Sequence, residues 1–113
     1  MFHTIKRILR QFLLRRKFSK DNKIRKGVIF SRDLKIGKGC SIGRNSIIGQ
    51  HVILGDDVRI GRDTFLERIS IGKASFIESG VGCTGYGNGK ILIGKESYIG
   101  IRDILDWSDN ITI

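Results

Sequence analysis

Two histidines occur in the chain, and a neutral imidazole is the side chain best suited to take up a proton near pH 7. His3 falls in the basic N-terminal segment, whereas His51 lies in the segment IGQHVI. The two cysteines are candidate nucleophiles. We expect Cys40 to be a core residue and Cys83 to be an exposed loop thiol without a cationic His to activate it. His51 is therefore the candidate catalytic base, although it has no evident partner in the sequence.

A six-residue repeat must position these side chains. Aliphatic or aromatic residues recur every sixth position, and Gly follows at 37, 43, 49, 55 and 61; the repeated residues are Ile24, Phe30, Ile36, Ile42, Ile48, Leu54, Ile60 and Leu66. The pattern returns after interruptions at Ile71 and Ile93. This spacing does not fit an amphipathic helix and predicts short extended segments joined by tight corners. At these corners we expect Gly to supply a positive φ.

A second inward position follows four residues after most of the repeated apolar residues. It holds small or β-branched side chains, such as Cys40, Ser46, Val52, Val58 and Thr64. A chain with two inward positions per hexad can coil and stack each extended segment on its counterpart one coil below, about 4.8 Å away. The absence of Pro suits strands whose N–H groups all donate to the next coil. The repeat therefore predicts an all-β parallel solenoid.

The hexads IGKGCS, IGRNSI, LGDDVR and IGRDTF resemble those of the hexapeptide-repeat acyltransferases over residues 24–113. This resemblance implies a left-handed parallel β-helix with three hexads per coil, here about four coils. The segment LDWSDNITI is similar to a coil of sugar O-acetyltransferases of cell-envelope polysaccharide synthesis. We expect residues 1–26 to form a leader and residues 27–113 a solenoid with a loop insertion near residues 80–90.

The resemblance also implies an activity. Family members move an acetyl or longer acyl group from acyl-CoA to a hydroxyl or amine of a sugar or glycan precursor, and homotrimers with active sites between prisms are usual. On this basis Tyr86, in the Gly-rich loop, and Asp106 and Trp107 are candidate acceptor-binding residues, although a corner carboxylate and a surface aromatic explain the last two equally well. A solvated loop is the simpler interpretation of the segment around Tyr86.

Similar enzymes place their catalytic His later in the chain, so we expect the base to be missing here and the chain to be the N-terminal part of a longer protein. No metal is expected, because the zinc sites of the carbonic anhydrases that share this fold need three His ligands. Acetyl-CoA or another acyl-CoA would be the only co-substrate.

Residues 1–26 carry ten Lys and Arg against one Asp, a net charge of +9, whereas the whole chain has +10. A helical stripe runs through this leader, made of Phe2, Ile5, Ile8, Leu9, Phe12 and Leu13, and we expect the helix to end near residue 15. The stripe is interpreted either as a cap over the first coil or as a contact with an anionic membrane surface. Nucleic-acid binding is disfavoured because no recognised motif accompanies the charge.

Neither a signal peptide nor a long apolar run is present, which predicts a cytoplasmic protein, at most peripheral at the inner face of the membrane. Three functions stay open: part of a CoA-dependent acyltransferase, a non-catalytic assembly module, or a peripheral membrane-binding domain.

Overall fold

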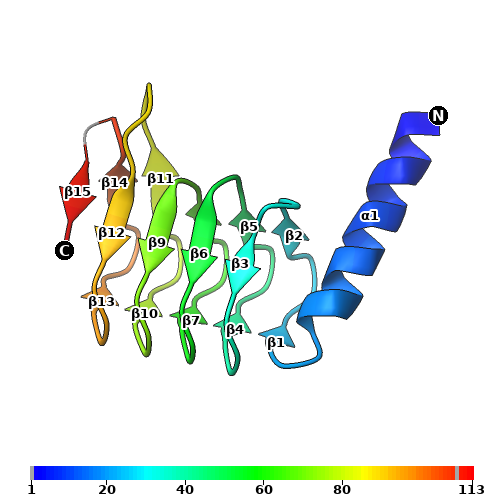
Figure 1. Ribbon diagram of the computed structural model, residues 1–113, viewed down its shortest axis with the longest axis horizontal. Helices are drawn as coiled ribbons and strands as arrows, with labels where there is room; N and C mark the ends of the chain where they lie inside the picture. The colour runs from blue at the N-terminus through cyan, green and yellow to red at the C-terminus, as the bar shows by residue number, and fades with distance from the viewer. Residues whose placement is uncertain (1, 109) are drawn as a thin grey trace.

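The computed structural model describes residues 2–108 and 110–113. Helix α1 (Phe2–Phe18) lies at one end of a stack of short parallel strands that form a β-solenoid (Figure 1). The described strands form three parallel sheets of five strands each. The fold class that the hexads predict is thus confirmed, with five coils rather than about four. The extra coil arises because the first strand, Lys23–Ile24, already pairs with Ser41–Ile42.

Each sheet collects one strand from every coil. The first sheet comprises β1 (Lys23–Ile24), β4 (Ser41–Ile42), β7 (Arg59–Ile60), β10 (Phe76–Ile77) and β13 (Tyr98–Ile99). The second comprises β2 (Ile29–Phe30), β5 (Ile47–Ile48), β8 (Phe65–Leu66), β11 (Gly82–Thr84) and β14 (Ile104–Asp106). The third comprises β3 (Lys35–Ile36), β6 (Val52–Leu54), β9 (Ile69–Ile71), β12 (Ile91–Ile93) and β15 (Ile111–Thr112).

Both inward positions of the hexad form the core. The large apolar position is buried at Ile42, Ile48 and Leu66, and the small position is buried at Val58 and Ser46. Equivalent residues stack in register, as Ile42 pairs with Ile60 in the next coil. Apolar side chains leave water all along this column, which is the main favourable term for a solenoid whose coils contact only their neighbours.

The interruptions of the repeat change the length of a coil but keep the stack in register. Ile42 pairs with Ile60, Ile60 with Ile77, and Ile77 with Ile99. The coil that starts at Ile60 is therefore slightly shorter than the one before it, and the coil that starts at Ile77 is longer. This longer coil contains the Gly-rich segment. Its strand β11 pairs with β8 and β14, so the excursion is confined to residues 85–90.

The hexad glycines allow the backbones of successive coils to approach closely. Our expectation that they supply a positive φ is wrong. The residues with positive φ are mostly other corner residues, such as Asn45, Asp57 and Asp63. At Gly43, by contrast, an added Cβ would lie 2.5 Å from both the Gly61 carbonyl carbon and the Arg62 nitrogen. The backbone of one coil therefore approaches the next so closely that a side chain does not fit.

Helix α1 covers the first coil with a face other than the apolar stripe. The Gln11 side chain donates to the Phe30 carbonyl at 2.7 Å and accepts from the Phe30 N–H at 2.8 Å, as a neighbouring strand would. Arg15 donates to the carbonyls of Ile24 and Arg25 at 3.0 and 2.6 Å. Phe18 is buried against Phe30. These contacts cap the edge of the first coil.

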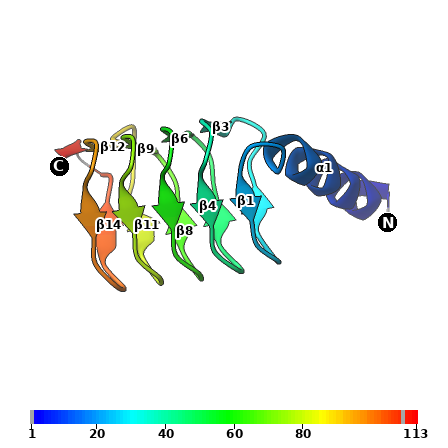
Figure 2. The ribbon, with the colours of Figure 1, turned by 90° about the horizontal axis from the view of Figure 1, so that it is seen from below.

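The helix continues to Phe18, beyond the expected end near residue 15, because Phe18 has this packing site. Asn22 then donates to the Phe18 carbonyl at 3.0 Å and accepts from the Cys40 N–H at 2.8 Å, which ties the helix end to the solenoid. Figure 2 shows the helix at the end of the stack near β1. None of the helices in residues 2–108 and 110–113 combines the length and the apolar character needed to cross a bilayer.

We predict that Gly43→Ala destabilises the protein by about 1–3 kcal/mol, because the new methyl group must push two coils apart. Gly82→Ala is the matched control, since no atom lies within 4 Å of the position that its Cβ would take. Chemical denaturation followed by circular dichroism measures both. Equal stability of the two variants would contradict the role of close stacking.

Candidate functional site

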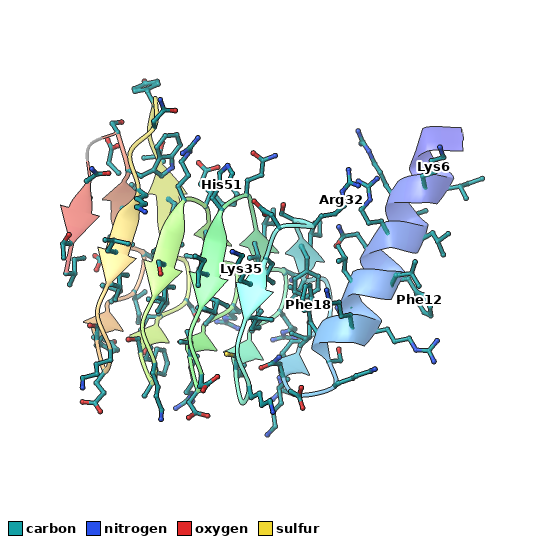
Figure 3. The ribbon with its side chains drawn as sticks, in the orientation of Figure 1. Lys6, Phe12, Phe18, Arg32, Lys35 and His51 are labelled. Carbon is teal, nitrogen blue, oxygen red and sulfur yellow. The ribbon has the colours of Figure 1, made fainter. Side chains whose placement is uncertain are left out.

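His51 has a partner that sequence analysis did not identify. Its Nδ1 lies 3.2 Å from the Asp33 carboxylate, and its backbone N–H donates to the same oxygen at 2.9 Å. Asp33 follows β2 and His51 precedes β6, so the two occupy the same corner of consecutive coils. Figure 3 labels His51 at this corner. His51 adopts a φ of 60° there, a conformation that His tolerates better than most residues.

Asp33 is held as an anion. Burial alone raises its pKa, but hydrogen bonds from the Ser31 hydroxyl and the His51 N–H, together with the charge of His51, outweigh this effect and lower the pKa below its ordinary value. Ser31 Oγ donates to Asp33 at 2.7 Å. A carboxylate beside Nδ1 attracts a proton on this nitrogen and favours the orientation in which Nε2 points away from the carboxylate. The imidazole and the carboxylate therefore form a close pair on one corner of the solenoid.

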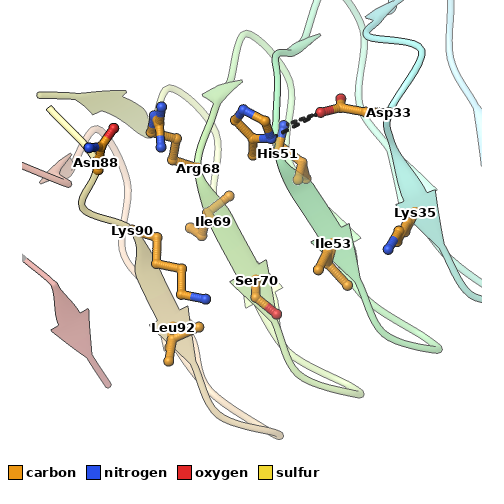
Figure 4. A pocket seen from close by; sticks show the side chains of 11 residues that line it. Asp33, Lys35, His51, Ile53, Arg68, Ile69, Ser70, Asn88, Lys90 and Leu92 are labelled. Atoms are coloured by element: carbon orange, nitrogen blue, oxygen red, sulfur yellow. Dashed lines mark hydrogen bonds and ion pairs between the residues drawn. The ribbon is translucent and has the colours of Figure 1, made fainter. Parts of the chain in front are cut away.

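The pair stands at the rim of a groove of about 610 Å³ over the outer face of β6, β9 and β12 (Figure 4). The outward side chains of these strands, Ile53, Ser70 and Leu92, line it with a mainly apolar surface. Both members of the pair are accessible, with His51 58% exposed and Asp33 41% exposed. A ligand in the groove can thus reach the imidazole.

Three cationic residues also line the groove: Lys35, Arg68 and Lys90. They come from β3, from the corner before β9 and from the end of the Gly-rich segment, and Asn88 lies beside them. The Arg68 guanidinium stacks over the Trp107 ring at 4.8 Å, which restricts its position. Apolar side chains flanked by cations suit a ligand that joins an organic group to phosphates.

The structure brings only one of the predicted site residues to this groove. Among the described residues, its lining includes His51 but not Tyr86, Asp106 or Trp107. The Tyr86 side chain is 84% exposed, and hydrogen bonds from Ser108 lower the pKa of the exposed Asp106. Trp107 is only 7% exposed and donates from Nε1 to Glu67 at 3.0 Å, which gives it a packing role. Acceptor binding by these three residues stays a prediction.

His3 belongs to α1, but its side chain lies outside the described part of the structure. In residues 2–108 and 110–113, no group of three or more His, Cys, Asp or Glu side chains is placed to hold a metal ion.

The sequence was compared with models of known protein families, and one of them matches. The model of the GMPPB C-terminal domain matches residues 24–102, which is more than half of the chain and covers most of the solenoid. The chain belongs to this family. No curated protein matches the sequence of this GMPPB C-terminal domain family member.

Two solved structures are also similar to this member of the GMPPB C-terminal domain family. Both are histidine mutants, one to Asn and one to Ala, of perosamine N-acetyltransferase from Caulobacter crescentus in complex with CoA and GDP-perosamine. The identities are 21% and 22%, and the TM-scores are 0.31 and 0.32. The matches cover 88% and 90% of this chain but only 59% and 60% of the solved chains. The chain thus spans about three fifths of their length.

Sequence reasoning missed Asp33, Lys35 and Lys90. The coil length could have identified Asp33 as the partner of His51. The two residues have the same separation in sequence as Ile36 and Leu54, which pair in successive coils. In a solenoid, two residues that are one coil apart lie side by side on one corner.

The expectation of an exposed Cys83 is wrong. Cys83 is buried in β11, and this burial raises the pKa of its thiol to about 11. Cys40 is buried as expected, and burial raises its pKa as well. The Cys40 thiol contacts the Gly55 carbonyl at 3.1 Å. The hydroxyl of Ser46, at the equivalent position of the next hexad, contacts the Gly61 carbonyl in the same way. Both thiols are therefore structural.

We predict that both thiols of the native protein react with an aromatic disulfide reagent at pH 8 at least 100-fold more slowly than those of the unfolded chain, because the thiolate is the reactive form and burial suppresses it. Absorbance of the released thiol measures the rates, with protein in guanidinium as the reference. The Cys40→Ser variant isolates Cys83. Rapid reaction of that variant in the native state would contradict the assignment.

Proposed function

We propose that the chain binds an acyl-CoA, in the simplest case acetyl-CoA, in the groove over β6, β9 and β12, and that the acyl group passes to a hydroxyl or amine of a sugar or glycan precursor. The observation that carries this proposal is the His51 imidazole, which lies 3.2 Å from the Asp33 carboxylate on the rim of that groove. The repeated hexads, which resemble those of acyltransferases, support the same reaction.

In the proposed reaction, His51 Nε2 takes the proton of the acceptor hydroxyl or amine as the oxygen or nitrogen attacks the thioester carbonyl carbon. The tetrahedral intermediate then breaks its carbon–sulfur bond. The CoA sulfur leaves and receives the proton from the imidazolium, which restores the base. Asp33 stabilises the imidazolium between the two steps, because it is a carboxylate near neutral pH and lies 3.2 Å from Nδ1.

The cations of the groove have a separate role in this proposal. Lys35, Arg68 and Lys90 would bind the phosphates of CoA, since ammonium and guanidinium groups form charge-assisted hydrogen bonds with phosphate oxygens. The aliphatic side chains of Ile53 and Leu92 would contact the uncharged part of the ligand.

We predict that the folded chain binds acetyl-CoA in isothermal titration calorimetry and that Lys90→Ala weakens this binding about tenfold. GDP-perosamine, which is bound in the two solved structures, is the first acceptor to supply, and release of the CoA thiol measures transfer. His51→Gln should lower the transfer rate about 100-fold or more, because the general base is lost.

The two measurements separate the parts of this proposal. His51→Gln should leave acetyl-CoA affinity within twofold, since the imidazole acts on the acceptor. An unchanged transfer rate in this variant would show that His51 is not the base, whereas acetyl-CoA binding without any transfer by the wild type would agree with our expectation that the base is missing from this chain. A well-folded protein without measurable acetyl-CoA binding would contradict the proposal as a whole.

We further propose that copies of the chain assemble into a homotrimer through the outer face of the second sheet. Its outward positions form an exposed apolar ladder, in which Ile29, Ile47 and Phe65 stack in register. Ile104 extends the ladder beyond Gly82. An exposed apolar surface of this kind favours an interface, and the non-catalytic alternative, an assembly module, would use the same face.

We predict that Phe65→Lys converts the assembly to monomers, because it places a charge in the centre of the ladder. Sedimentation velocity measures the mass. Tyr98→Lys is the control, since Tyr98 is an exposed aromatic residue on the first sheet. A wild-type protein that sediments as a monomer, or a Phe65→Lys variant that stays trimeric, would contradict this interface.

A further inference from the structure

Helix α1 leaves the apolar stripe from Ile5 to Leu13 uncovered, while the side chain of Phe2, also assigned to the stripe, lies outside the described part of the structure. Five of its apolar side chains are between 54% and 66% exposed: Ile5, Ile8, Leu9, Phe12 and Leu13. Figure 3 shows Phe18 directed toward the solenoid and Phe12 on the side of the helix away from it. The sequence stripe thus does not cap the first coil; that task falls to Gln11, Arg15 and Phe18.

The two faces of the helix follow from its 3.6-residue period. Gln11, Arg15 and Phe18 are separated by four and three residues and share one face, whereas Leu9 and Phe12 lie on a different face. The contacts that hold the helix to the solenoid therefore do not involve the stripe. A second partner can cover the stripe while the cap stays in place.

The charge of the helix identifies the chemistry of that partner. Within residues 2–18 there is no Asp or Glu, while Arg7, Arg10, Arg16 and Lys17 accompany the capping Arg15. These cations extend over most of the length of the helix. Exposed Leu, Ile and Phe side chains among Lys and Arg fit the boundary between the acyl chains and the headgroups of a lipid bilayer. This boundary is apolar on the acyl side and, with acidic lipids, anionic on the headgroup side.

We propose that α1 docks in the plane of an anionic lipid bilayer, with Ile5, Leu9 and Phe12 in the acyl boundary and Arg10, Arg16 and Lys17 on lipid phosphates. An orientation in the plane is favoured because cations spread from Arg7 to Lys17 would otherwise enter the hydrocarbon, where each is costly. Gln11 and Arg15 keep the solenoid attached to the side of the helix away from the stripe. The solenoid would stand at the membrane without being embedded in it.

The proposal is tested by cosedimentation of the full chain with vesicles. Vesicles of phosphatidylcholine and phosphatidylglycerol, mixed two to one, provide the anionic surface, and pure phosphatidylcholine vesicles provide the neutral one. We expect binding to the anionic vesicles to be at least tenfold stronger and to fall in 0.5 M NaCl, because salt screens the attraction to the headgroups.

Two helix variants separate the apolar and the electrostatic contributions. Leu9→Gln combined with Phe12→Gln should lower the partition coefficient at least tenfold, because two buried apolar side chains are lost. Arg10→Gln combined with Lys17→Gln should lower it about tenfold. The control is Ile53→Gln combined with Leu92→Gln, two exposed apolar residues of the third sheet, and we expect a change below twofold.

Folding of each variant is checked by circular dichroism, and Ile8→Gln, at a position that is well exposed, replaces the double variant if that variant unfolds. Absence of binding to anionic vesicles would overturn the proposal. Equal binding by the stripe variant and the wild type would do so as well. If the stripe variant instead lowers the mass measured by sedimentation velocity in the absence of lipid, the stripe contacts a second copy of the chain, and the membrane assignment is wrong.

Discussion

The rest of the structure depends on the close approach of successive coils at their corners. Backbone N–H and C=O groups pair from coil to coil along all three sheets, as in the bond from Gly43 N to Ile60 O at 2.8 Å. This spacing is fixed by the hydrogen bonds and leaves no room for a Cβ at Gly43. Small inward residues complete the corners, since Ser46 Oγ donates to the Gly61 carbonyl at 2.9 Å. The rows of equivalent side chains on each face follow from this regular stacking.

Regular stacking converts sequence distance into spatial proximity. Residues that are one coil apart lie beside one another on the same face or corner, whatever their chemical type. Asp33 and His51 become a pair in this way, and Arg68 occupies the corresponding corner position in the next coil, where its φ of 49° resembles that of His51. The solenoid can therefore present polar groups in a row on a rigid frame. A groove forms where such a row borders an outward apolar ladder, as it does beside Ile53 and Leu92.

The sequence was sufficient to predict the column of buried side chains, because the apolar positions of the hexad are its direct cause. It was less informative about features that depend on where each coil begins. The shortened coil between Ile60 and Ile77 and the lengthened coil between Ile77 and Ile99 shift every later position, so Cys83 could be assigned to a loop although it stacks on Leu105 in a strand. The pairing of Asp33 with His51 could have been predicted from the coil length, but the hexad pattern marks the inward positions and these two residues lie on an outward corner. The attachment of the helix uses Gln11 and Arg15 beside Leu14 and Phe18, so its apolar signal is weaker than that of the exposed stripe.

The position of α1 illustrates why an amphipathic pattern alone does not identify the face that packs against the protein. The end of a β-solenoid differs from an ordinary core surface, because its edge strands expose N–H and C=O groups that need partners. An apolar stripe laid over this edge would bury those groups without hydrogen bonds, at a cost of about 1–3 kcal/mol for each group. Gln11, with both a donor and an acceptor in its amide, can replace the missing strand, and Arg15 can serve two carbonyls at once. The polar face must therefore turn inward, and the apolar face is left available for another surface.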